Sequence, residues 1–148
     1  MLEFIILKRL LLTLLLCGLI GIERERAHKM AGLRTHALVG MGSALLTMLA
    51  IYGFQAYGYS GGDAASRIIS NIIVGIGFIG GGAILRQENH VVGTTTAATL
   101  WLVSAIGIAV GMGFTYGAVL ATLFGYVILT VFFGFEKIVL GSDHNNKE

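Results

Sequence analysis

The sequence predicts an all-α membrane protein, a polytopic helical bundle with about five transmembrane helices. Of its 148 residues, 55% are hydrophobic and only 12% are charged. A soluble domain carries about 25% charged residues, so this chain has too few charges to cover a water-exposed surface. Its apolar stretches are continuous rather than alternating, which favours helices over strands. Their lengths match the ~20 residues that a helix needs to cross a bilayer.

The spacing of charged residues predicts where the helices run. Three long segments contain no Asp, Glu, Lys or Arg: residues 35–62, 68–85 and 89–135. The first two have room for one span each, whereas the third has room for two spans and a turn. Glycines between positions 111 and 117 are the best turn signal in that segment. Together with the N-terminal apolar run, the predicted spans are 4–22, 37–57, 67–85, 95–112 and 116–135.

Basic residues predict the orientation, because Lys and Arg favour cytoplasmic loops. Arg86 follows the third predicted span, and four basic residues follow the first: Arg24, Arg26, Lys29 and Arg34. This distribution predicts an outside N-terminus and a cytoplasmic C-terminus. Lys8 and Arg9 weigh against that orientation, unless they reach the outer interface or pair inside the bundle.

The third predicted span carries a polar face. Asp63 and Arg67 are four residues apart and share one side of a helix, and Asn71 and Gly75 continue that side. With Gly77, these residues are candidates for an ion path in which Asp63 supplies the carboxylate. The alternative is an ion pair that only fixes the end of the helix. One carboxylate and one amide could hold Mg²⁺ only weakly, so we expect no firmly bound metal or cofactor.

Glycines recur at four-residue spacing in the last three predicted spans. The pairs are Gly77 and Gly81, Gly107 and Gly111, and Gly113 and Gly117. Small residues at this spacing favour close helix packing in lipid, and we expect the chain to form homo-oligomers through such faces. The dense glycine run at 75–82 could also allow an unwound segment, as in the discontinuous helices of transporters.

A cluster of charges surrounds the first predicted loop. Its members are Glu23, Arg24, Glu25, Arg26, Arg34 and Arg86. One interpretation is a solvated loop that sets the topology and touches anionic lipid headgroups. The other is a cytoplasmic contact for a partner protein, in which Glu23 faces inward to meet Arg34 or Arg86.

The fourth predicted span begins with a run of three threonines, Thr94, Thr95 and Thr96. We expect one of them to cap the helix by accepting a backbone N–H group. The alternative is a hydroxyl-lined cavity near Arg86. The four histidines of the chain have no pair at the spacing of metal ligands on a helix, so no metal site is expected from them.

Long stretches of the chain resemble the MgtC/SapB family of bacterial inner-membrane proteins. The resemblance rests on GLIGIERERAHKMAGLRTHALVGMGSALLTMLA (18–50), DAASRIISNIIVGIGFIGGGAILR (63–86) and VVGTTTAATLWLVSAIGIAVGMG (91–113). It implies five spans, a cytoplasmic C-terminus and a link to magnesium homeostasis and to survival of pathogens inside host cells. It further implies that many members regulate other membrane machinery, for which the rotary ATP synthase or a magnesium transporter are possible partners.

The chain departs from this family in two respects. Many relatives carry a soluble C-terminal domain, whereas here the sequence ends eleven residues after Lys137. We therefore expect a membrane domain over 1–138 and a polar tail over 139–148, with no soluble domain. Val92 stands where relatives commonly have a basic residue, and Asn71 where a glutamine is common.

These observations predict a non-enzymatic protein of the bacterial inner membrane. We expect it to act in magnesium or cation homeostasis, and in stress or virulence adaptation, by binding another membrane complex through its charged cytoplasmic face. The alternative is an ion transporter or channel. An enzyme is disfavoured because Ser43 lacks a histidine at comparable depth and Asp63 lacks a second acid. The net charge of +2 is too small to indicate a nucleic-acid partner.

Overall fold

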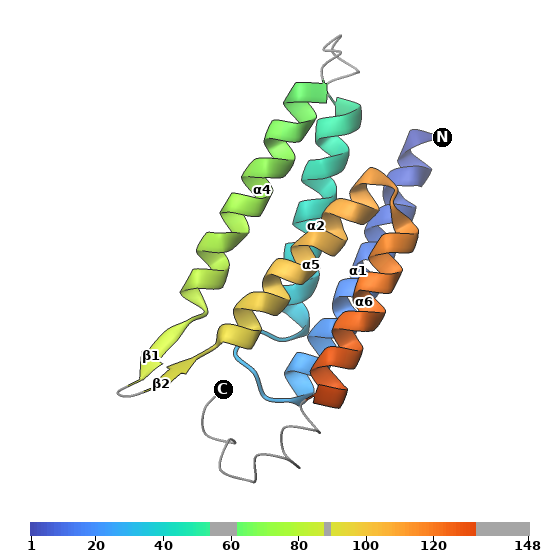
Figure 1. Cartoon of the computed structure of the whole chain (residues 1–148). Helices are drawn as coiled ribbons and strands as arrows, with labels where there is room; N and C mark the ends of the chain where they lie inside the picture. Colours follow the sequence, from blue (N-terminus) through green and yellow to red (C-terminus); the bar gives the residue numbers. More distant parts are fainter. Residues whose placement is uncertain (54–61, 88–89, 133–148) are drawn as a thin grey trace.

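The protein is a bundle of long helices with one short hairpin (Figure 1). The computed structural model describes residues 1–53, 62–87 and 90–132. Its elements in chain order are α1 (Leu2–Arg26), α2 (Leu33–Met48), the π-helical turn η1 (Leu49–Gly53), α4 (Gly62–Gly82), β1 (Leu85–Gln87), β2 (His90–Val92), α5 (Thr94–Met112), α6 (Thr115–Val127) and the π-helical turn η2 (Ile128–Phe132). The predicted fold class is confirmed.

Five helices of the described chain are long and apolar enough to cross a membrane. They are Leu2–Arg26, Leu33–Gly53, Ala65–Gly82, Thr94–Met112 and Thr115–Phe132. The number of spans predicted from the charge spacing is therefore confirmed, with boundaries that differ by a few residues. Because the number of crossings is odd, the start of α1 and the end of η2 lie at opposite ends of the bundle (Figure 1). The expected polar tail over 139–148 lies outside the described residues.

Helix α5 holds the centre of the bundle, where it contacts α1, α2, α4 and α6. Its glycines allow a very close approach to α2. A Cβ atom on Gly107 would lie 2.2 Å from the carbonyl oxygen of Gly40, and one on Gly111 would lie 2.8 Å from that of Ala44. The predicted pair Gly107 and Gly111 therefore packs inside the chain itself.

The apolar core lies between α1, α5 and α6. The buried side chains there form a single cluster, which includes Ile20, Val103, Ile106 and Ala118. Large side chains such as Leu15, Phe78 and Phe124 are exposed on the outside of the bundle. Apolar side chains on the surface and a close-packed interior are expected of a protein that lies in hydrocarbon.

The turn between α5 and α6 falls where the glycines predict it. Gly113 has the left-handed φ of 92°, and its N–H donates to the Val110 carbonyl at 2.9 Å. The N–H of Phe114 donates to the Ala109 carbonyl at 2.8 Å. This pair of bonds is the Schellman arrangement, which ends a helix at a glycine.

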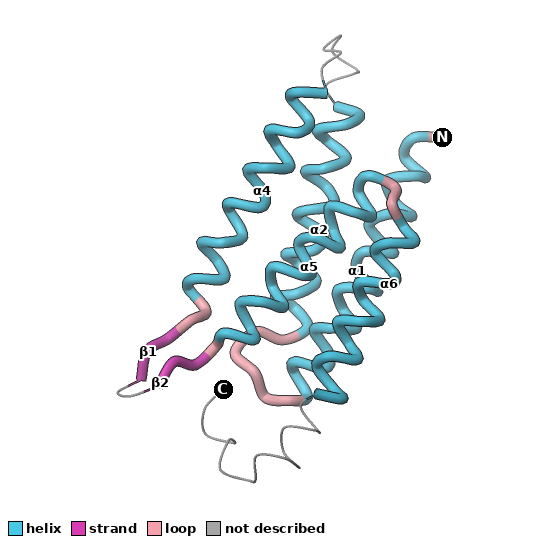
Figure 2. The backbone as a smooth tube through the Cα atoms, viewed as in Figure 1, coloured by secondary structure: helices cyan, strands magenta, loops and turns pink. Residues whose placement is uncertain are grey.

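Helix α4 runs without interruption to Gly82, so the unwound segment that the glycine run could have allowed is absent from this helix. In hydrocarbon an unwound turn would leave backbone groups without hydrogen bonds, and a Cβ atom on Gly75 or Gly77 would meet no other part of the described chain within 4 Å. After α4 the chain forms an antiparallel hairpin in which Leu85 pairs with Val92. Figure 2 shows these strands in magenta at one end of the bundle, which we call the hairpin end.

The entry into α5 corrects the prediction of a threonine cap. Helix α5 already begins at Thr94, and the N-cap position belongs to Gly93. Gly93 has a φ of 87°, and a Cβ atom there would lie 1.9 Å from the Ala83 carbonyl oxygen. Only glycine fits this left-handed, crowded position. The chain thus enters α5 through a glycine, and the three threonines lie within the first turn of the helix.

Candidate functional site

A buried ion pair lies where α1 ends at the hairpin end. Arg24 is only 2% exposed, and its Nη2 donates to Glu23 Oε1 at 2.6 Å while its Nε donates to Glu23 Oε2. The prediction that Glu23 meets Arg34 or Arg86 is wrong, because the adjacent Arg24 takes both carboxylate oxygens. A buried guanidinium needs such a counter-charge, since an unpaired charge away from water is very unfavourable.

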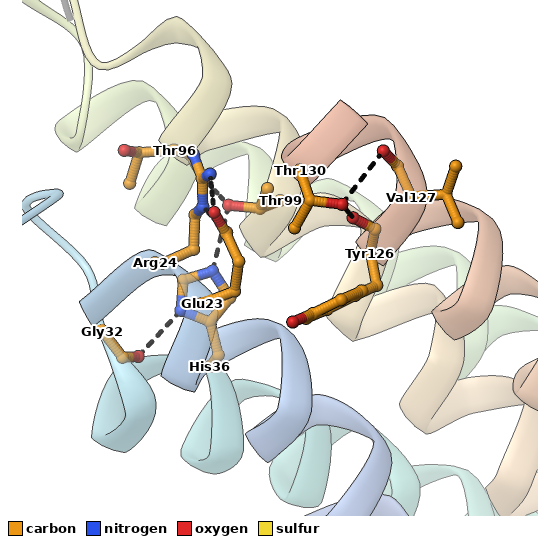
Figure 3. A network of polar contacts seen from close by, with 9 residues as sticks. All are labelled: Glu23, Arg24, Gly32, His36, Thr96, Thr99, Tyr126, Val127 and Thr130. Atoms are coloured by element: carbon orange, nitrogen blue, oxygen red, sulfur yellow. Dashed lines mark hydrogen bonds and ion pairs between the residues drawn. The ribbon is translucent and has the colours of Figure 1, made fainter. Parts of the chain in front are cut away.

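A buried histidine joins three parts of the chain beside this pair (Figure 3). His36 is fully buried. Its Nδ1 lies 2.8 Å from the Gly32 carbonyl oxygen, and its Nε2 lies 3.0 Å from Thr99 Oγ1. Thr99 Oγ1 in turn donates to the Thr96 carbonyl at 2.9 Å. We call these contacts the histidine network. They tie the loop before α2, helix α2 itself and helix α5 together.

The histidine network can exist in two hydrogen-bonding states. Its three contacts need three protons, because the carbonyl oxygens of Gly32 and Thr96 only accept. A neutral imidazole and one hydroxyl together supply two protons, whereas an imidazolium and one hydroxyl supply three. Protonated His36 therefore satisfies every contact at once. With neutral His36, the single proton of the Thr99 hydroxyl can be donated either to the imidazole ring or to the Thr96 carbonyl.

Another carboxylate of the predicted cluster stabilises the start of α2. Glu25 Oε2 accepts the backbone N–H of Leu33 at 2.8 Å, and Gly32 packs against the same side chain. The first N–H groups of a helix have no partner within the helix, and a negative charge there is favourable. Glu25 thus holds the loop between α1 and α2 in place rather than facing a partner.

The other three members of the predicted cluster remain on the surface. Arg26, Arg34 and Arg86 are exposed and belong to α1, α2 and β1, which all reach the hairpin end of the bundle (Figure 1). We call them the basic face. The structure therefore divides the six predicted residues into three that make contacts within the chain, Glu23, Arg24 and the exposed Glu25, and three exposed arginines.

A groove of about 600 Å³ separates α2 from α4 within the membrane-spanning region. Asn71 and Gly75 of the predicted ion path line it on α4, and Gly42 and Ser43 line it on α2. Ser43 Oγ hydrogen-bonds to Ser104 Oγ of α5 at 2.9 Å, and Ser104 also lines the groove. The residue spacing did not indicate this serine pair, because its members are 61 residues apart in the chain.

Two further residues of the predicted ion path, Arg67 and Gly77, are not among the residues that line that groove. Arg67 and Gly77 are exposed on α4, and the Asp63 side chain lies outside the described part of the structure. A second groove of about 590 Å³ runs along the other side of α4, between it and α5, and includes Trp101. Among the side chains that the structure describes, no group of three His, Cys, Asp or Glu residues could hold a metal ion.

Arg9 pairs inside the bundle at the end opposite the hairpin. Its Nη1 donates to the Gly111 carbonyl at 2.7 Å and to Tyr52 Oη at 2.8 Å. The Gly111 carbonyl belongs to the last turn of α5, where carbonyls lack helical partners and a cation is favourable. Arg9 therefore connects α1 with η1 and α5. This contact is one of the two explanations that the sequence left open for a cation near the N-terminus.

Comparison with known proteins agrees with the resemblance seen in the sequence. A model of the MgtC family matches residues 10–138. "Putative magnesium transporter YhiD" of Escherichia coli K12 is 44% identical over 133 residues, which cover 88% of this chain and 60% of YhiD. Protein SrpB of Synechococcus elongatus is 36% identical over 138 residues, covering 88% of this chain and 76% of SrpB.

Protein MgtC of Brucella abortus strain 2308 is 41% identical over 110 residues, which cover 74% of this chain and 44% of MgtC. The chain thus spans between two fifths and three fifths of the length of YhiD and of this MgtC. No solved structure is significantly similar. The five spans, the match of the family model and these identities together show that the chain belongs to the MgtC family.

Proposed function

We propose that this integral membrane protein acts in magnesium or cation homeostasis by modulating another membrane complex, without catalysing a reaction itself. The observation that carries the proposal is the division of the predicted charge cluster. Glu23, Arg24 and Glu25 have partners within the chain, whereas Arg26, Arg34 and Arg86 of the basic face are exposed. A fold that engages both acids of the cluster in contacts within the chain and presents three exposed arginines offers a surface for an acidic partner.

The basic residues support a cytoplasmic position for the basic face. Arg26, Arg34 and Arg86 lie at the hairpin end, whereas Arg9 lies at the other end. Arg9 is held by Tyr52 and the Gly111 carbonyl, so it can remain outside the cytoplasm without an exposed charge in lipid. The preference of basic loops for the cytoplasm then favours a bacterial inner-membrane protein with its N-terminus outside.

A partner for this face needs acidic groups that guanidinium can bind. Arginine forms paired hydrogen bonds with carboxylates and phosphates, so an acidic loop of a membrane complex fits the face. The rotary ATP synthase and a magnesium transporter are the kinds of complex that the family resemblance suggests. Anionic lipid headgroups share the chemistry and would hold the same arginines near the membrane surface. A role in stress or virulence adaptation would follow from control of such a complex.

Neutralising the basic face tests this proposal. The triple variant Arg26→Gln, Arg34→Gln, Arg86→Gln should insert normally, because none of these side chains is buried. The assay is growth in low magnesium of a strain that lacks this protein, with each variant supplied in its place. We expect the triple variant to restore at most ~10% of the growth that the unchanged protein restores. Lys8→Gln, which removes an exposed cation at the opposite end, is the matched control and should retain full activity. Equal growth with the triple variant and with the control would contradict the proposal.

Binding of the same proteins to lipid vesicles distinguishes a protein partner of the basic face from anionic lipid headgroups. If the arginines only contact lipid, the triple variant should lose affinity for vesicles with anionic headgroups but keep its effect on growth. If they contact a protein, growth should be lost even where membrane insertion and amount are unchanged.

A second candidate function is ion passage along the groove between α2 and α4. The observation that favours it is that Asn71 lines the same groove as Ser43 and Ser104, whose hydroxyls hydrogen-bond to each other. The printed name of YhiD also points toward magnesium transport. The described lining supplies no carboxylate, however, and Mg²⁺ in proteins is usually bound through one or two of them. This candidate therefore ranks second.

A further inference from the structure

Helix α4 presents a regular seam of exposed side chains, of which Asn71 also borders the groove between α2 and α4. Its members recur at alternating steps of four and three residues: Arg67, Asn71, Val74, Phe78 and Gly81. All are exposed. Val74 is 75% and Phe78 is 87% exposed, and a Cβ atom on Gly81 would meet nothing within 4 Å. An average repeat of 3.5 residues is the spacing with which one helix packs along another in a left-handed pair.

The opposite side of α4 makes the contacts that hold it to the bundle. Ile76 is buried, and a Cβ atom on Gly80 would lie 3.6 Å from the Ala97 carbonyl oxygen of α5. The seam is therefore not needed for the fold of the single chain. The glycine pair on α5 is already occupied by α2, and Gly113 and Gly117 lie against the Arg9 and Phe114 side chains. A Cβ atom on Gly77 or Gly81, in contrast, would meet nothing within 4 Å.

Contact of this seam with lipid is unfavourable because of the Asn71 amide. Asn71 lies six residues, or ~9 Å, beyond Ala65, where the candidate membrane span of α4 begins. Within the described part of the chain, no hydrogen bond satisfies its amide. Hydrocarbon offers no partner to an amide, and leaving one unpaired there costs several kcal/mol. A helix that brings its own donor and acceptor removes this cost.

From these observations we infer that the seam is the contact surface of a parallel homodimer, in which Asn71 pairs with Asn71 of a second copy. Two copies insert in the membrane in the same direction, so a two-fold axis along the membrane normal brings identical residues together. An asparagine amide both donates and accepts and can therefore bind itself. A single asparagine in such a seam also fixes the register of the two helices.

The other members of the seam suit this arrangement. Gly81 lets two backbones approach closely, and Val74 and Phe78 supply the apolar contact between them. Arg67 lies one turn, or ~6 Å, farther from the membrane centre than Asn71, where water screens the repulsion between two guanidinium groups. The dimer is independent of the proposed function, because the seam and the basic face use different residues.

Crosslinking of purified protein in lipid vesicles tests which surface two copies of the chain use to contact each other. The unchanged protein, whose cysteine Cys17 is buried, is the blank. Val74→Cys should form a crosslinked dimer with a short bis-maleimide. Leu123→Cys, on the 53% exposed surface of α6, is the matched control and should remain monomeric. A protein that gives no dimer at position 74, or equal dimer at both positions, would overturn the inference.

The role of Asn71 is tested by energy transfer between labelled copies over a series of protein-to-lipid ratios. Asn71→Leu should raise the apparent dissociation constant of the dimer about 3- to 30-fold, the range found for polar contacts between membrane helices. Asn71→Gln keeps the amide and should change it less. Circular dichroism of the same vesicles establishes that both variants are inserted and helical. An unchanged dissociation constant with Asn71→Leu would contradict the pairing, and energy transfer no greater than random proximity would exclude the dimer.

Discussion

Helices α4 and α5 are both glycine-rich spans, yet they have opposite relations to the rest of the molecule. Half of the α5 span is buried within the chain, against 11% of the α4 span. The glycines of α5 lie against α2 at distances that leave no room for a Cβ atom, whereas those at 75, 77, 81 and 82 in α4 meet nothing within 4 Å. The same residue type thus packs the fold in one helix and leaves an open surface in the other.

This difference separates the part of the molecule that maintains the fold from the part that remains available. Around α5, buried polar groups are satisfied by partners within the chain, as His36 is by Thr99 and Ser43 is by Ser104. Along α4, Arg67, Ser70 and Asn71 are exposed. Substitutions should therefore unfold the protein when they fall on the first part and alter its interactions when they fall on the second.

The largest expected effect comes from filling the contact between α5 and α2. Gly107→Leu forces a side chain into a space where even a Cβ atom lies 2.2 Å from a backbone oxygen, so the two helices must separate. We expect little or no folded protein in membranes. Gly77→Leu, with open space around it, should fold and insert as the unchanged protein does. The amount of inserted protein and its thermal unfolding in detergent measure both. Similar loss in the two variants would contradict the division between the helices.

A smaller effect is expected from breaking the buried ion pair. Glu23→Gln leaves the Arg24 guanidinium buried without its counter-charge, which we expect to lower the free energy of unfolding by about 3 kcal/mol. On α4, Arg67→Gln removes an exposed charge and should change it by less than about 0.5 kcal/mol. Thermal or denaturant unfolding of the two variants side by side measures the contrast. If Glu23→Gln is as stable as Arg67→Gln, the ion pair does not support the fold.

The smallest of these effects concerns the histidine network. Thr99→Val removes the hydroxyl that contacts His36 Nε2 and leaves a buried ring nitrogen unpaired, which costs about 1–2 kcal/mol. Thr99→Ser keeps the hydroxyl and should recover most of that stability. Ser70→Ala, on the exposed side of α4, should have no measurable effect. Equal unfolding midpoints for Thr99→Val and Thr99→Ser would show that the hydroxyl contact contributes nothing.

The architecture could be predicted because it follows from local composition. Residues 35–62 and 68–85 carry no charge, and a charge-free run of that length has few alternatives to a membrane span. The turn at Gly113 is likewise local, because a left-handed residue that ends a helix is a property of glycine itself. Three glycines after Ile79 suggested unwinding, but hydrogen bonding in a bilayer favours a helix even there.

The contacts between helices could not be predicted, because they depend on which spans are neighbours. His36 and Thr99 are 63 residues apart, and Arg9 and Gly111 are 102 apart, so no spacing relates them. The partner predicted for Glu23 was wrong for the same reason: the sequence places Arg34 and Arg86 at the same membrane face but does not say that Arg24 turns inward. Glu25 and the N-terminus of α2 are close in sequence, but the loop that joins them had no recognisable pattern.

The central claim is that this protein modulates a membrane complex rather than carrying ions itself. The direct test is magnesium uptake into vesicles that contain the purified protein, measured with an enclosed magnesium-sensitive dye beside vesicles with Asn71→Leu and empty vesicles. We predict that folded, inserted protein gives no uptake above that of empty vesicles, with or without the Asn71 substitution. Uptake by the unchanged protein that Asn71→Leu abolishes would contradict the claim and assign transport to the groove between α2 and α4.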